Sequence, residues 1–399
     1  MREDIKERIE LIKKGKVPQG YKKTKLGIVP KDWEVLCIKD CLERVDNAVV
    51  VDEKTDYMQI GIRSHGKGIF YKEPVTGKEL GNKRVFWVEP NCFVVNIVFA
   101  WEQAIGRTTD YELGMVASHR FPMYKPINNK VDVDYLVQYF LTQKGKDVME
   151  YASPGGAGRN RTLGQDIFMR SNLVCPSMNE QLAIVKLMNL IEEKIGLQKK
   201  ILEEKKLLRQ AITQRLVGEI NDNKVVLYSF NDIFKNISSK GHKIDKSDYQ
   251  RYGRFPVVDQ GKNKIVAFSN SAEHKIECPK SGIIVFGDHT RVVKYVDYDF
   301  IVGADGTQLL VSKNKKVLTK YLYYILKSKN IQNDGYSRHY KYIREYLYKV
   351  PSLEEQEKII EILSTYDKEI ELFGNQLEQA KLEKKAMMQL LLSGIVRVN

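Results

Sequence analysis

Two hexapeptides, PSMNEQ from Pro176 and PSLEEQ from Pro351, open two stretches of the chain that repeat one another 175 residues apart. After each hexapeptide, the side chains suited to a helix seam recur at alternating steps of four and three residues. This is the a/d pattern of a coiled coil, in which one stripe of each helix faces a partner helix. The first series is Ile184, Met188, Ile191, Ile195, Gln198, Leu202, Lys205, Arg209, Ile212 and Leu216. The second is Ile359, Leu363, Tyr366, Ile370, Phe373, Leu377, Ala380, Lys384, Met387 and Leu391.

The flanking residues predict where each helix begins and ends. Glu180 and Glu355 stand in the first turn, where an acidic side chain suits the helix dipole, and Gly218 and Gly394 follow the last seam residue as helix stops. Each seam runs for roughly 33 residues, or about 50 Å. A single stripe of this kind is also typical of an ordinary core helix. Two copies in one register instead favour helices that pack on each other.

The short linker after Gly218 constrains the direction of the second helix. Its few residues span at most about 25 Å, so the second globular segment must begin near the end of the first helix. We therefore expect two antiparallel helices related by a pseudo-twofold axis, with one globular domain at each end. The predicted divisions are an N-terminal helix and linker (1–24), a first domain (25–174), a central helix (175–220), a second domain (221–349) and a C-terminal helix (350–399).

Both globular segments predict mixed α+β domains. Short β-type runs alternate with Gly, Pro and Asn clusters, and a helix is expected near the end of each segment, over 133–142 and near 320–327. Outside the long helices, the two halves hardly match in sequence. Domains that differ in this way are expected to bind two different targets.

The charge of the chain favours a polyanionic partner. There are 65 Lys and Arg residues against 51 Asp and Glu residues, which gives a net charge of +14 and an isoelectric point near 9.2. Nucleic acid is the commonest partner for such a surplus. The sequence has no apolar run long enough to span a membrane, and it starts with a charged amphipathic stretch rather than a signal peptide. We expect a cytoplasmic protein.

The sequence offers little for catalysis or metal binding. The five cysteines are scattered and lack nearby histidines, so free thiols explain them better than a metal site. The stretch from Gly61 to Gly68 nearly fits a phosphate-binding loop, but Gly68 stands where the magnesium-binding hydroxyl belongs, and a strand is expected to follow. No cofactor loop, catalytic tetrapeptide or metal-binding helix is found. The sequence thus predicts a chain that recognises its partner, has no catalytic or metal-binding residues and holds no cofactor.

Several turns combine residue types that contact DNA. Forked Arg, Lys and amide donors read base edges, while basic and hydroxyl groups contact phosphates. A single turn of this kind can equally be a solvated loop, but the pattern recurs in both domains. The candidate DNA-binding residues are Arg63, Ser64, His65, Lys67, His119, Arg120, Arg159, Arg161, Gln260, Lys262, His289, Thr290, Arg291, Arg338, His339 and Tyr340.

The order of domain, PS-x-x-EQ helix, domain and PS-x-x-EQ helix resembles the specificity subunit of type I restriction-modification systems. The stretches LGIVPKDWEV, IGIRSHGKGIF, VVNIVFAWEQA and SHRFPMYKP resemble its target-recognition domains in the first half. FPVVDQGKNKIVAFSN, IIVFGDHTRVVKYVD and IVGADGTQLL do so in the second. The resemblance implies that each domain reads one half of a bipartite, asymmetric double-stranded DNA site, while the helices set the spacer and dock the modification subunits.

The same resemblance assigns catalysis to other chains. Two modification subunits would bind S-adenosylmethionine and methylate adenine, and restriction subunits would use ATP and Mg²⁺. Two alternatives from other classes stay open at this point: a self-contained DNA methyltransferase or nuclease, and a coiled-coil scaffold without a nucleic-acid function.

Overall fold

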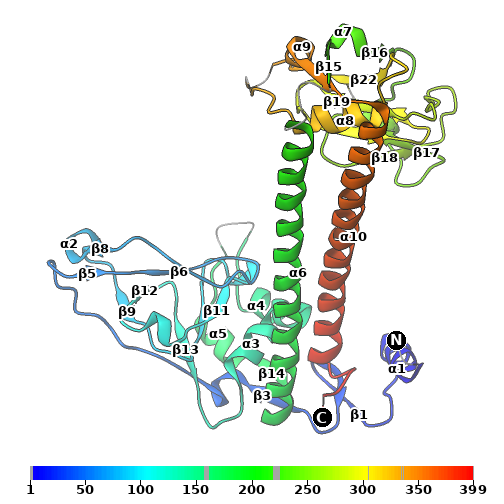
Figure 1. Ribbon diagram of the computed structural model, residues 1–399. Coiled ribbons are helices and arrows are strands. Elements are labelled where there is room, and N and C mark those ends of the chain that lie inside the picture. The colour runs from blue at the N-terminus through cyan, green and yellow to red at the C-terminus, as the bar shows by residue number, and fades with distance from the viewer. Residues whose placement is uncertain are drawn as a thin grey trace. The chain divides into compact units, whose positions relative to one another are not determined.

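A computed structural model describes residues 3–156, 161–218, 225–303, 305–333, 335 and 337–398. The chain divides into two compact units. Unit 1 comprises Met1–Leu197 and Glu378–Asn399, and unit 2 comprises Gln198–Leu377. Two long helices, α6 (Met178–Gly218) and α10 (Leu353–Leu392), each contribute a segment to both units (Figure 1). They contain 41 and 40 residues, or about 60 Å each. The expected length was too short because it counted the seam alone, whereas both helices begin within the hexapeptide.

Unit 1 combines short antiparallel sheets with helices. A four-stranded sheet has the order β11 (Ile105–Arg107), β10 (Phe93–Val95), β13 (Met123–Pro126) and β4 (Leu42–Arg44). The two-stranded pairs are β1 (Tyr21–Thr24) with β2 (Gly27–Pro30), β3 (Glu34–Cys37) with β14 (Asn172–Cys175), β5 (Asp56–Tyr57) with β8 (Val75–Thr76), β6 (Ile60–Ile62) with β7 (Ile69–Tyr71), and β9 (Val85–Trp87) with β12 (Val116–Ser118). The shorter helices are α1 (Glu3–Lys13), α2 (Gly77–Leu80), α3 (Val133–Phe140), α4 (Gln143–Tyr151) and α5 (Gln165–Arg170).

Aromatic side chains fill the core of unit 1. Phe93 of β10 lies against Phe140 of α3 and Phe168 of α5, with ring centroids 5.2 and 6.2 Å apart. The same hydrophobic cluster includes Ile184 and Met188 of α6. The start of the long helix is therefore part of the domain core.

Unit 2 has a similar make-up with its own topology. A four-stranded antiparallel sheet has the order β16 (Phe234–Ile237), β22 (Thr307–Ser312), β19 (Ile283–Gly287) and β20 (Val293–Val296). A three-stranded sheet joins β18 (Ala267–Ser269), β17 (Phe255–Val258) and β21 (Ile301–Val302), the last two being parallel. Strand β15 (Val226–Ser229) pairs with β23 (Leu347–Val350), and the shorter helices are α7 (Phe230–Ile233), α8 (Thr319–Ser328) and α9 (Tyr340–Glu345).

The two units contain the same pairing of the long helices. In unit 1, Ile184 and Met188 share a cluster with Met387 and Leu391. In unit 2, a second cluster joins the residues 175 positions away, namely Ile359 and Leu363 with Ile212 and Leu216. In each unit, α6 residues with higher numbers contact α10 residues with lower numbers. In unit 2, for example, Lys205 pairs with Glu369 and Arg209 pairs with Asp367. The two helix segments are therefore antiparallel within each unit. The mixed α+β fold and the duplication are confirmed.

Two of the three polar positions of the first seam, Lys205 and Arg209, have charged partners on α10. Arg209, which is 9% exposed, donates two hydrogen bonds to the Asp367 carboxylate, at 3.0 and 3.4 Å. Lys205 Nζ lies 2.7 Å from a Glu369 oxygen and 5.0 Å from the centre of the Phe373 ring. In unit 1, the pair that corresponds to Arg209 and Asp367 by the 175-residue offset joins Lys384 to Glu192. These ion pairs explain why the first seam tolerates charged residues.

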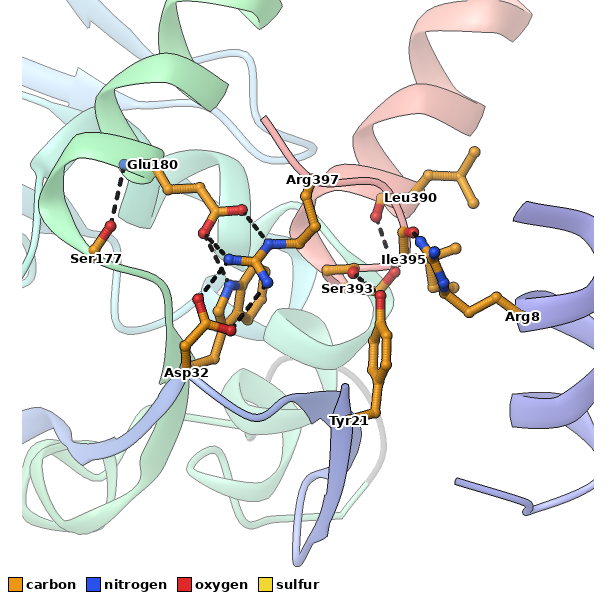
Figure 2. A network of polar contacts seen from close by, with 11 residues as sticks. Arg8, Tyr21, Asp32, Ser177, Glu180, Leu390, Ser393, Ile395 and Arg397 are labelled. Atoms are coloured by element: carbon orange, nitrogen blue, oxygen red, sulfur yellow. Dashed lines mark hydrogen bonds and ion pairs between the residues drawn. The ribbon is translucent and has the colours of Figure 1, made fainter. Parts of the chain in front are cut away.

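The chain ends of unit 1 are held together by a polar network (Figure 2). Arg397 donates hydrogen bonds to Glu180 in the first turn of α6 and to Asp32. Tyr21 Oη donates to the Gly394 carbonyl at 2.6 Å, and Arg8 of α1 donates to the Ile395 carbonyl. The N-terminal helix therefore lies beside the tail that follows α10. Among the described residues, none of the helices is both long and apolar enough to cross a membrane.

Candidate nucleic-acid interface

Predicted residues from several segments of unit 1 contact one loop, residues 96–103. The turn between β6 and β7 carries Arg63, Ser64, His65 and Lys67, and it docks through main-chain bonds from His65 to Glu102 and from Gly66 to Gln103, at 2.7 and 3.0 Å. Gly66 has φ +65, and a Cβ there would lie 2.4 Å from the Leu141 side chain. The close approach therefore needs glycine at this position.

Two arginines, Arg161 and Arg120, contact the same loop, and a third, Arg63, lies over a ring of strand β7. The Arg161 guanidinium lies 5.6 Å from the centre of the Trp101 ring, and the Arg63 guanidinium lies 4.8 Å from that of Phe70. Arg120 joins the loop through its carbonyl, which accepts a hydrogen bond from Ile97 N at 3.0 Å. Arg63, His65, Lys67, His119 and Arg120 are exposed. The predicted residue Arg159 lies outside the described residues.

Hydrogen bonds in unit 2 join two predicted loops into one surface. Gln260 donates through Nε2 to the Asp305 carbonyl at 2.9 Å, and its Oε1 accepts from His289 N at 3.1 Å. Thr290 Oγ1 donates to the Gln260 carbonyl. Gly287 permits this contact, because a Cβ there would lie 2.1 Å from Thr290 Oγ1. The side chains of Lys262 and Thr290 are exposed at the surface.

A third predicted segment, 338–340, attaches together with the preceding Ser337 to the turn that carries Asp288 and His289. The Ser337 carbonyl lies 3.3 Å from His289 Nδ1, and Tyr340 N donates to Asp288 Oδ1 at 2.8 Å. Arg338 is exposed. Arg291 is half-buried at φ +61 and donates through Nη1 to the Ile331 carbonyl at 3.0 Å, so part of its donor capacity holds the fold.

His339 requires a correction. It was a candidate for DNA contact, but its side chain is fully buried and its Nδ1 donates to the Asp288 carbonyl at 2.8 Å. Nε2 has no hydrogen-bond partner among the described residues. In this structure His339 therefore supports the loop from inside the domain.

Sequence reasoning missed Lys294, a buried lysine that supports the Gln260 loop. Its Nζ donates to the carbonyls of Asp259 and Asn263, at 2.8 and 2.5 Å. Burial lowers the pKa of Lys294, while the nearby Asp259 carboxylate acts in the opposite direction. The available signal was a lysine inside the apolar run VVKYV of β20, where a charged side chain needs polar partners.

The two surfaces are rich in donors and poor in catalytic groups. Among the described residues, no three His, Cys, Asp or Glu side chains gather as a metal site. The thiols that could act as nucleophiles are free, and burial raises the pKa of Cys41 to about 12 and that of Cys92 to about 11. Strand β7, rather than a helix, follows the Gly61–Gly68 loop, as the sequence predicted. Cations and amides of this kind can bind phosphates and base edges.

Comparison with known proteins gives concordant matches. Residues 223–382 match a family model described as the type I restriction modification DNA specificity domain. Two Methanocaldococcus jannaschii proteins, named as the type I restriction enzyme MjaX and MjaVIII specificity subunits, are each 23% identical to this chain. The alignments cover 95% of this chain and 97% of MjaX, and 93% of this chain and 94% of MjaVIII. The S subunit of a type I restriction-modification system from M. genitalium shares the fold, with a TM-score of 0.57 at 15% identity over 90% of this chain and 96% of that one.

Proposed function

We propose that this chain, which belongs to the family of type I restriction-modification specificity subunits, reads a bipartite DNA site with one α+β domain on each half. The observation that carries the proposal is the repeated unit. The same antiparallel helix pairing occurs twice, each time with its own α+β domain and its own loop cluster. A duplicated support that carries two unlike surfaces is suited to two unlike half-sites.

The proposed contacts follow from the chemistry of each cluster. In unit 1, Arg63 and Arg120 supply exposed forked donors, and Lys67 supplies a cation for a phosphate. In unit 2, the exposed residues among those predicted from the sequence are Thr290, Lys262 and Arg338. Because the loops are preformed by internal hydrogen bonds, binding loses less conformational entropy than it would with flexible loops. The two half-sites are expected to differ in sequence.

The chain is the non-catalytic subunit of its system, and it works with DNA and with other restriction-modification subunits. We propose the finer arrangement that the resemblance implied. Two modification subunits dock on the long helices and bind S-adenosylmethionine, restriction subunits bind ATP and Mg²⁺, and this chain holds no cofactor. We place this assembly in the cytoplasm, and the helices set the spacer between the half-sites.

Labelled S-adenosylmethionine tests the division of labour. The purified chain is incubated with host genomic DNA from a strain that lacks the gene, alone and with the co-expressed modification subunit. Methyl transfer is expected only in the second reaction. Turnover by the purified chain alone would instead favour a self-contained methyltransferase, and no transfer in either reaction would remove the support for the proposal.

A further inference from the structure

The glutamine that ends each repeated hexapeptide makes the same three hydrogen bonds in both units. Gln181 Nε2 donates to the carbonyls of Pro176 and Lys130, both at 2.9 Å, and its Oε1 accepts from Asp132 N at 2.8 Å. Gln356 Nε2 donates to the carbonyls of Pro351 and Lys316, both at 2.9 Å, and its Oε1 accepts from Leu318 N at 2.9 Å. Both side chains are fully buried.

The position of these bonds connects two parts of each unit. Asp132 and Leu318 are the N-cap residues of α3 and α8, which belong to the globular domains. Pro176 and Pro351 lie two residues before the first residues of the long helices. Each glutamine therefore ties the start of a domain helix to the start of a long helix. Buried hydrogen bonds are directional, and losing one partner leaves main-chain groups unpaired.

We propose that Gln181 and Gln356 are positioning residues that fix the orientation of each recognition domain on its long helix, and so restrict the complex to one spacer length between the half-sites. The inference rests on the proposed function. This role explains why both hexapeptides end with glutamine. The preference for Pro, Ser and Glu at the start of a helix does not explain the glutamine. A side chain with one amide donor group and one carbonyl acceptor meets the need of two carbonyls and one N–H.

Unit 1 has a second attachment, and the described residues of unit 2 show no equivalent bond at the corresponding position. Glu180 is 6% exposed and accepts a hydrogen bond from Trp33 Nε1 at 3.1 Å. It also accepts hydrogen bonds from Arg397 (Figure 2). Trp33 directly precedes β3 of the same domain. The equivalent Glu355 is exposed. Loss of the glutamine should therefore affect unit 2 more than unit 1.

The test uses the assembled complex with modification subunits. The target motif is first determined by sequencing methylated adenines in the host, and duplexes are then made with the native spacer and with spacers one base pair shorter and longer. Methylation rates are compared for the wild type, Gln181→Met and Gln356→Met, since methionine keeps the length of the side chain. Gln389→Met and Gln376→Met, at exposed positions of α10 in units 1 and 2, are the matched controls.

The preference for the native spacer should fall by about tenfold in Gln356→Met, the factor that corresponds to about 1.4 kcal/mol. It should fall less in Gln181→Met, and further when Arg397→Gln is added. The controls should keep the wild-type preference. Circular dichroism checks folding, and Leu318→Pro serves if Gln356→Met does not fold. This substitution removes the Leu318 N–H that donates to Gln356 Oε1. Proline tolerates the backbone at this position, where φ is −80.

The possible failures are distinct. Folded variants that keep the wild-type spacer preference would overturn the positioning role, because a residue that only stabilises the fold would change the amount of active complex and not this ratio. A wild-type complex that methylates no bipartite duplex would instead contradict the proposed function.

Discussion

Arg63 and Arg291 differ in how far their side chains are available for contact with DNA. Arg63 is exposed over Phe70, whereas Arg291 also donates to the Ile331 carbonyl. We predict that Arg63→Ala weakens binding to the first half-site by about 1–3 kcal/mol and leaves the melting temperature unchanged. Arg291→Ala should weaken the second half-site and also lower the melting temperature. Titration with duplexes that carry one intact half-site measures the affinities, and thermal unfolding measures the melting temperatures. Unchanged affinity for both half-sites would show that neither arginine contacts DNA.

At the scale of single residues, the sequence indicates the chemistry of a side chain better than it indicates whether that side chain points to the solvent or into the core. The sequence predicts DNA contacts from the turn that carries Arg338, His339 and Tyr340, and Arg338 is exposed. His339 beside it is buried, and its Nδ1 donates to the carbonyl of Asp288, a residue 51 positions earlier in the chain. Its partner could not be identified without the pairing of the two loops.

Lys327 leads to a prediction about pH. Its Nζ donates to Tyr323 Oη at 2.7 Å and lies 3.6 Å from Asp367. Although 35% of the side chain is exposed, desolvation of the ammonium group lowers the pKa of Lys327, and the Asp367 carboxylate acts in the opposite direction. The folded protein therefore releases this proton at lower pH than the unfolded chain does. The unfolding free energy of the wild type should rise relative to Lys327→Met as pH increases through the lowered pKa towards about 10.4. Denaturant titrations at pH 7.5 and pH 9.5 measure the difference, and a gap independent of pH would contradict the assignment.

At the scale of elements, two equivalent ion pairs of the helices differ in burial. The Arg209 side chain is 11% exposed beside Asp367, whereas the side chains of Lys384 and Glu192 are 30% and 60% exposed. Asp367→Ala should lower the unfolding free energy by about 3 kcal/mol, because Arg209 loses its carboxylate in a buried place. Glu192→Ala should cost less than about 1 kcal/mol. Equal costs in denaturant titrations would show that burial does not distinguish the pairs.

The long helices were the most predictable elements, because a heptad pattern over many turns has few alternative structures. The partners of Lys205 and Arg209 were not predictable, since Glu369 and Asp367 lie outside the seam of α10 and are identified only by the register of the two helices. The domain sheets were also less predictable. Strand β3 pairs with β14, which lies more than a hundred residues later, and strands this short carry little periodicity. The glutamines of the hexapeptides were visible as a repeat, but their domain partners were not.

At the scale of the whole chain, the net charge of +14 predicts salt-dependent binding. Basic side chains displace counterions from DNA phosphates, so log affinity should fall linearly with log salt concentration. With about four phosphate contacts, affinity for a specific duplex should fall roughly a hundredfold between 50 and 200 mM salt. Fluorescence anisotropy across this range measures the slope, and a flat response would argue against phosphate contacts.

The central claim is that the two domains specify two unlike halves of one DNA site. Methylome sequencing tests it most directly, in the host strain, in a strain that lacks the gene and in a strain that carries Arg63→Ala. We predict that one bipartite motif with unlike halves and a fixed spacer disappears with the gene. We further predict that the Arg63 variant loses stringency in one half only. A methylome that does not change on deletion, or a single continuous motif that depends on the gene, would contradict the account.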